Sequence, residues 1–113
     1  MKKYLLLLVL AVAGLALAPS LNAAGHHFGG VAGIVLDSSG NPVPDAMVGV
    51  EVHTPNGRIY QARTHTDRRG RFSFQQVPAG PGVVKAHKRG VGHGQVRGKV
   101  IAGQVVRARI VLR

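Results

Sequence analysis

The adjacent histidines His26 and His27 are the first residues of the sequence whose type and position could do chemistry. Cleavage of an exported chain after Ala23 would make His26 the third residue of the new terminus, and cleavage after Ala24 would make it His27. A free amine, two backbone nitrogens and an imidazole can then form a square-planar nitrogen site, which suits Cu(II) or Ni(II). His26 and His27 are therefore candidate metal ligands, and the sequence indicates no other cofactor.

The other histidines give a weaker signal. His53, His65 and His87 fall at outward positions of different expected strands, and His93 falls in a glycine-rich basic segment. The four could gather at one edge of the fold, but their spacing does not require it. We expect them to be solvated surface residues.

Basic residues dominate the rest of the chemistry. The chain has 15 Lys and Arg against 4 Asp and Glu. Without Lys2 and Lys3, which fall in the leader described below, 13 cations remain and the net charge is +9. Such a balance favours anionic partners such as a polysaccharide, phospholipid head groups or nucleic acid. The alternative is that the charge has no specific partner and only keeps the protein soluble, because equally charged molecules repel one another.

Aromatic residues argue against nucleic acid as the partner. Beyond the leader the chain has only Phe28, Tyr60, Phe72 and Phe74, and three of these fall at positions expected to be buried. Binding of single-stranded nucleic acid relies on exposed aromatic rings that stack on bases. An anionic polysaccharide or another envelope component is therefore the expected partner, and the oligomeric state stays open.

The N-terminus is typical of a secretory signal peptide. Lys2 and Lys3 precede an apolar run over residues 5–18, Pro19 ends it, and small residues follow at 23 and 24. The alternative, a membrane anchor, is disfavoured because the apolar run is short for a bilayer. We expect residues 1–23 to be removed, residues 24–30 to be a flexible His- and Gly-rich terminus, and the protein to be secreted or periplasmic without a transmembrane helix.

The elements that position these residues are expected to be strands. Past the leader there is no helical periodicity, and short runs of β-branched residues alternate with clusters of Gly, Pro, Asn and Asp. This pattern predicts an all-β sandwich of about seven strands, with strands at 31–36, 46–53, 58–66, 71–75, 83–88, 95–100 and 105–112. Residues 88–94 are expected to form a mobile basic loop.

The charged stretch at residues 64–80 is expected to be scaffold. Asp67 can cap a four-residue turn through its side chain, and Gly70 can adopt the left-handed conformation that closes such a turn. Phe72 and Phe74 then alternate toward the core. Arg68 and Arg69 lie in the middle of this turn, and they do not by themselves form a site.

The register of the last two strands predicts a basic face. A hairpin with a three-residue loop at 101–103 would bury the apolar residues of both strands, whereas a two-residue loop would bury arginines, at a cost of several kcal/mol. The first register places Arg97, Lys99, Arg107 and Arg109 on one outer face. An anion bound there, with Arg63 and Lys85 nearby, would relieve their repulsion; the alternative is that the side chains splay into water.

Two segments resemble the carboxypeptidase regulatory-like domain: residues 31–46, with Gly40-Asn41-Pro42 at their centre, and residues 66–80, with Thr66-Asp67 and Val77-Pro78-Ala79-Gly80. The resemblance covers residues 31 to about 112, taken as a domain over 31–113. It implies a transthyretin-like Greek-key sandwich that acts as a non-catalytic module of secreted or envelope proteins. The chain departs from the family pattern at Asp45, where a glycine is usual, and at Gly82, where an aromatic residue is usual.

No enzyme activity is expected. The sequence has no Ser-His-Asp order with strand and turn support, and three of its four carboxylates lie in or beside turns. Hydroxyisourate hydrolases are enzymes with a similar transthyretin-like sandwich, and their signature has a histidine in the first strand and a Tyr-Arg-Gly-Ser end. The sequence lacks both parts of this signature. Here the first strand ends Ile34 to Asp37, and the chain ends Ile110 to Arg113.

Overall fold

The fold is built from strands alone over the residues that the structure describes. The structure is a computed structural model, and it describes residues 27–113; the predicted signal peptide and His26 lie outside this range. Within the range no helix is long and apolar enough to cross a membrane. The strands are β3 (Phe28–Leu36), β4 (Met47–His53), β5 (Ile59–His65), β6 (Arg71–Pro78), β7 (Gly80–Lys88), β8 (Gly92–Val100) and β9 (Val105–Val111).

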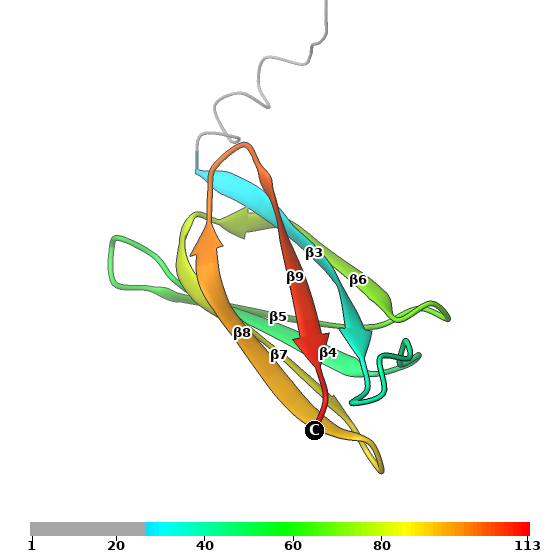
Figure 1. The fold of residues 1–113 in the computed structure, drawn as a ribbon. Coiled ribbons are helices and arrows are strands. Elements are labelled where there is room, and N and C mark those ends of the chain that lie inside the picture. The colour runs from blue at the N-terminus through cyan, green and yellow to red at the C-terminus, as the bar shows by residue number, and fades with distance from the viewer. Residues whose placement is uncertain (1–26) are drawn as a thin grey trace, which may run out of the picture.

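The strands form two sheets packed face to face (Figure 1). One sheet has the order β6-β3-β9, in which β3 is antiparallel to β6 and parallel to β9. The other has the order β5-β4-β7-β8 and is antiparallel throughout. The chain changes sheet after β3, β5, β6 and β8, so both sheets are built from segments far apart in the sequence. The prediction of an all-β sandwich of about seven strands is confirmed.

Period-two alternation of apolar residues builds the core between the sheets. In β4, Val48, Val50 and Val52 are buried, while the residues between them face outward. Phe72 and Phe74 of β6 point to the same core, and their rings meet edge to face at 6.0 Å between centroids. Because successive side chains of a strand point to opposite faces, this burial fixes the outward set of residues as well.

Two boundaries differ from the sequence expectation. Strand β3 begins at Phe28, so residues 28–30, expected in the flexible terminus, pair with β6 and β9 instead. Residues 88–94 do not form a loop, because β7 and β8 pair as far as Lys88 opposite Gly92 and only residues 89–91 turn. Both segments are rich in glycine, and the second is also basic, so their sequences are typical of loops. Strand pairing uses backbone hydrogen bonds, however, and therefore does not require apolar side chains.

The predicted hairpin of the last two strands is wrong. Strand β8 is the edge of one sheet and β9 is the edge of the other, with residues 101–104 crossing between them. Strand β9 pairs in parallel with β3 instead of folding back onto β8. The two edges still run side by side (Figure 1), and His93 and Arg113 exchange backbone hydrogen bonds of 3.1 and 3.4 Å at one end. We call the gap between these edges the β8/β9 seam.

The turn at residues 67–70 is scaffold, as expected. The side chain of Asp67 accepts hydrogen bonds from the backbone N–H groups of Arg69 (2.8 Å) and Arg71 (3.0 Å). Gly70 has φ of 76°.

The departure from the family pattern at Asp45 is explained by its backbone conformation. Asp45 occupies the position where the family usually has glycine, and its φ is 54°. Aspartate is one of the few residues that tolerate this left-handed conformation, which explains why the substitution is accommodated.

The departure at Gly82 also has a structural reason. A Cβ on this residue would lie 2.5 Å from the carbonyl oxygen of Glu51 and 3.0 Å from Cγ2 of Val52. Strands β7 and β4 therefore approach each other more closely than a side chain at position 82 would allow. The core here is filled by the valines of β4 and not by a ring from β7.

Asp67→Asn should make the stability of the fold less sensitive to acid. The backbone hydrogen bonds from Arg71 and Arg69 lower the pKa of Asp67, so its charged form is favoured in the folded state. A lowered folded-state pKa stabilises the protein above the unfolded-state value and loses that contribution as pH falls through the folded-state pKa. Urea unfolding from pH 7 to pH 3 should show wild type more stable at neutral pH and the difference shrinking as the pH falls below the usual pKa of an aspartate. An equal gap at both pH values would contradict this role.

Candidate anion-binding surface

A pair of cations flanking a glycine lies on the outer face of the four-stranded sheet. Gly49 of β4 is directly opposite Arg63 of β5 on one side and Lys85 of β7 on the other. Both basic side chains are exposed, and strand spacing places their backbones about 10 Å apart. Because Gly49 has no side chain, an anion could settle between the two cations against the backbone.

Strand β8 extends this surface along the edge of the sheet. Arg97 lies opposite Val83, and Lys99 lies opposite Pro81. Both are exposed, and their spacing of two residues separates them by about 6.7 Å along the strand. We call the set of Arg63, Lys85, Arg97 and Lys99 the cationic face.

Arg107 and Arg109 do not belong to this face, which corrects the sequence expectation. They are exposed on β9, so they project from the outer face of the three-stranded sheet. Arg109 and Arg71 of β6 lie opposite Ile34 from its two sides. The alternation along each strand was read correctly, but the assumed hairpin placed both strands in one sheet.

The two groups of cations meet at the β8/β9 seam. A small cavity of about 70 Å³ opens there, with an apolar floor that includes Val31, Val50 and Val106. Arg97, Lys99 and Arg107 all contribute to its lining. The six predicted residues therefore form a basic band that passes around an edge of the sandwich instead of a single flat face.

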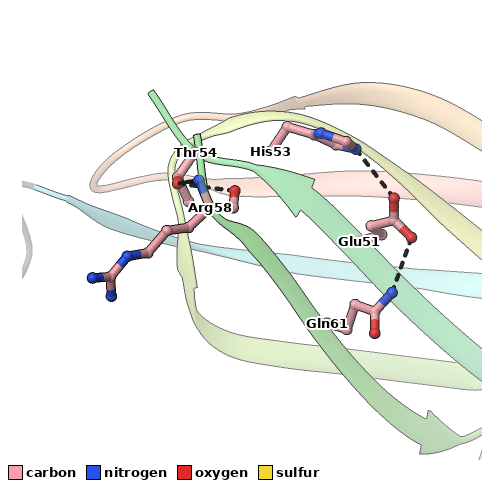
Figure 2. Close-up of polar contacts among 5 residues, drawn as sticks. All are labelled: Glu51, His53, Thr54, Arg58 and Gln61. Atoms are coloured by element: carbon pink, nitrogen blue, oxygen red, sulfur yellow. Dashed lines mark hydrogen bonds and ion pairs between the residues drawn. The ribbon is translucent and has the colours of Figure 1, made fainter. Parts of the chain in front are cut away.

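Little negative charge opposes this band. Among residues 27–113 only two ion pairs occur, His53 with Glu51 and Lys88 with Asp45, and neither contains an arginine. Glu51 is the one carboxylate projecting from the middle of a strand in this range. It accepts hydrogen bonds from Gln61 (3.2 Å) and His53 (3.1 Å), as Figure 2 shows.

The partners of Glu51 keep it charged. Hydrogen bonds from Gln61 and His53 lower its pKa, and the positive charges of His53 and Lys85 act in the same direction. Glu51 is therefore an anion at neutral pH and sits two residues along β4 from Gly49. Its charge limits how strongly the cationic face can attract an anionic ligand.

The predicted N-terminal metal site is only partly within the described residues. His27 is exposed in a turn just before β3, and its carbonyl oxygen accepts a hydrogen bond from the N–H of Ala79 at 2.9 Å. His26 and the terminus itself lie outside the described range. The metal site at His26 and His27 thus stays a prediction.

A three-stranded sheet packed on a four-stranded antiparallel sheet, with β3 and β9 parallel, defines a transthyretin-like β-sandwich that carries a basic band. The model of the carboxypeptidase regulatory-like domain matches residues 30–113. The chain belongs to this family, as the sequence resemblance implied. No curated protein matches the sequence.

Solved structures with the same fold have diverse activities. Chlorocatechol 1,2-dioxygenase from Pseudomonas putida is 14% identical with a TM-score of 0.61, over 78% of this chain and 61% of the enzyme, so this chain spans less than two thirds of it. Sea bream transthyretin, solved with thyroxine, is 20% identical with a TM-score of 0.54, over 74% and 86%. A proposed carbohydrate-binding protein from Pseudomonas aeruginosa is 16% identical with a TM-score of 0.54, over 83% and 97%. These likenesses establish the fold alone.

Proposed function

We propose that this chain is an exported, non-catalytic binding module that holds an acidic polysaccharide of the cell envelope on its cationic face. The observation that carries the proposal is the placement of Arg63 and Lys85 on either side of Gly49. Each carboxylate or sulfate of such a polymer can approach two cations at once without displacing a side chain. Arg97 and Lys99 continue the positive charge along the sheet for the next units of the polymer.

Several features favour a polysaccharide over nucleic acid. Phe72 and Phe74 are buried, and Phe28 and Tyr60 are half-buried, so few ring faces are available to stack on bases. The similar structure of the proposed carbohydrate-binding protein from Pseudomonas aeruginosa is consistent with a sugar ligand. An exposed sheet face with spaced cations is also suited to an extended polymer.

The arrangement of the carboxylates supports a non-catalytic role. Asp37 and Asp67 accept backbone hydrogen bonds within their own turns. Asp45 lies 3.8 Å from the Nζ of Lys88, and Glu51 is held by Gln61 and His53. Each is committed to a different part of the fold, so no two are placed to share acid and base roles across a substrate.

Reversing the charge of Arg63 and Lys85 should weaken polymer binding strongly. A cation near an anionic surface contributes about 1 kcal/mol, so the Arg63→Glu/Lys85→Glu double variant should bind roughly tenfold or more weakly. Binding of fluorescent alginate at 50 mM and 500 mM salt would measure the effect. Wild-type binding should also fall at high salt because exposed charges are screened. Glu51→Gln should act in the opposite direction and strengthen binding.

A matched control is available in the turn after β5. Arg68→Glu/Arg69→Glu changes the net charge equally but alters residues outside the cationic face. It should weaken alginate binding far less than the Arg63/Lys85 variant. An Arg107→Glu/Arg109→Glu variant tests whether the polymer continues around the seam. Equal losses for the turn and face variants, or binding that survives 500 mM salt, would overturn the proposal.

A further inference from the structure

Three histidines and a methionine form one row across the four-stranded sheet. Met47 of β4 is directly opposite His65 of β5 on one side and His87 of β7 on the other. His87 is in turn directly opposite His93 of β8. Residues opposite each other on neighbouring strands project from the same face, with Cβ atoms about 5 Å apart. The row is fixed by backbone pairing and not by side-chain packing.

All members of the row are accessible. Met47 is 43% exposed, which makes it one of the few large apolar side chains that the core does not cover. His65, His87 and His93 are exposed as well. An exposed thioether between imidazoles has no evident packing role, whereas both groups are ligands for soft transition metals.

We propose that Met47, His87 and His93 form a binding site for Cu(I) on the outer face of the four-stranded sheet. His87 is the centre of the site because it neighbours both other ligands. Its imidazole and that of His93 supply two nitrogen donors, and Met47 supplies a sulfur donor. His65 lies on the far side of Met47 and acts as an outer fourth donor.

The charges around the row select among metals. Arg63 and Lys85 lie two residues along their strands from His65 and His87, so they repel any cation bound in the row. This repulsion scales with the charge of the ion and is halved for Cu(I) relative to a divalent metal. The two nearby carboxylates already have partners, Asp67 in the backbone of its turn and Asp45 in Lys88. Hard ions that bind through charge and oxygen ligands are disfavoured, and a soft monovalent ion is favoured.

The site forms by rotation of exposed side chains. Among residues 27–113 no three His, Cys, Asp or Glu side chains are already grouped to hold a metal. The proposed set has two imidazoles and a thioether, and each is free to change rotamer on an open surface. Neutral imidazole is the binding form, so acid should release the metal.

Competition for Cu(I) against the chromophoric chelator bicinchoninate, with ascorbate as reductant, tests the site. Every protein should carry His26→Ala and His27→Ala, so that the N-terminal histidines do not contribute. His87→Ala should weaken Cu(I) binding by roughly ten- to hundredfold, since even supporting groups of metal sites have effects of this size. Met47→Leu and His93→Ala should act in the same direction, and His65→Ala less. His53→Ala is the control, because this histidine lies on the same face at the other end of β4.

Methyl NMR of methionine gives a second reading of the same site. The chain has 2 methionines, Met1 and Met47, so the Met47 methyl signal can be assigned with one variant. One equivalent of Cu(I) should shift this signal in the parent protein but not in His87→Ala. An unmoved Met47 signal, or equal affinity in the His87→Ala and His53→Ala proteins, overturns the proposal. Arg63→Glu/Lys85→Glu should strengthen Cu(I) binding while it weakens alginate binding, so the two proposals fail separately.

Discussion

Gly33→Ala should strongly destabilise the fold. A Cβ at this position would overlap the carbonyl oxygen of Ala108 and lie 2.8 Å from Cζ of Phe72. The overlap with Ala108 involves the backbone of β9, which pairs with β3 at this point, so no side-chain rotation relieves it. Overpacking of a core usually costs about 1–3 kcal/mol, and a clash with paired backbone belongs at or above the top of that range. A small domain has only about 5–15 kcal/mol of stability to lose.

Gly98→Ala is the matched control for this substitution. Gly98 also lies within a strand, but a Cβ there would meet nothing within 4 Å, because it faces the open β8/β9 seam. The same change should therefore be neutral or slightly stabilising, since alanine restricts the unfolded chain more than glycine does. Urea unfolding of both variants measures the contrast. Similar midpoints for Gly33→Ala and wild type would contradict the close approach of β3 and β9.

The position of β9 also links Gly33 to the basic band. Arg107 and Arg109 reach the surface because β9 lies in parallel beside β3. A displaced β9 would move both arginines and widen the seam. Displacement of β9 in Gly33→Ala should accordingly disturb Arg107 and Arg109 more than Arg63 and Lys85, which lie on β5 and β7 of the other sheet.

The sequence was informative wherever local rules decide structure. Alternation of apolar residues identified the strands and placed Phe72 and Phe74 inside, and the Asp67-to-Gly70 segment identified a turn. It also identified which residues of β8 and β9 face outward. These features depend on contacts within a few residues of the chain, which a single sequence contains.

Pairing between distant strands could not be predicted in the same way. The two last strands are neighbours in sequence, so a hairpin was the simplest interpretation, yet β9 pairs with β3, more than 70 residues earlier. Because pairing between distant strands is not visible in one sequence, His65, His87 and His93 were expected at the surface but not in a row. All three are exposed in the structure. Only the register of three strand pairs brings them together with Met47. An exposed methionine in an alternating strand was the one available signal.

Thr66→Val should cost roughly 2–6 kcal/mol, because it leaves two buried backbone groups without partners at about 1–3 kcal/mol each. Thr66 is the one buried polar residue among residues 27–113. Its hydroxyl donates a hydrogen bond to the carbonyl oxygen of Val43 (2.7 Å) and accepts one from the N–H of Ala46 (2.8 Å). Valine has nearly the same shape as threonine, so the effect isolates the hydrogen bonds from packing.

Thr66→Ser keeps the hydroxyl and removes one methyl group, so it should cost only about 1 kcal/mol. Urea unfolding of the two variants therefore separates hydrogen bonding from packing, and equal losses would show that the hydroxyl is not the stabilising group. The consequence extends to the metal-binding row, since Thr66 fixes residues 43–46, which lead directly into Met47. A Thr66→Val protein that still folds should bind Cu(I) more weakly than Thr66→Ser, because the segment that leads into Met47 is held less firmly at the start of β4.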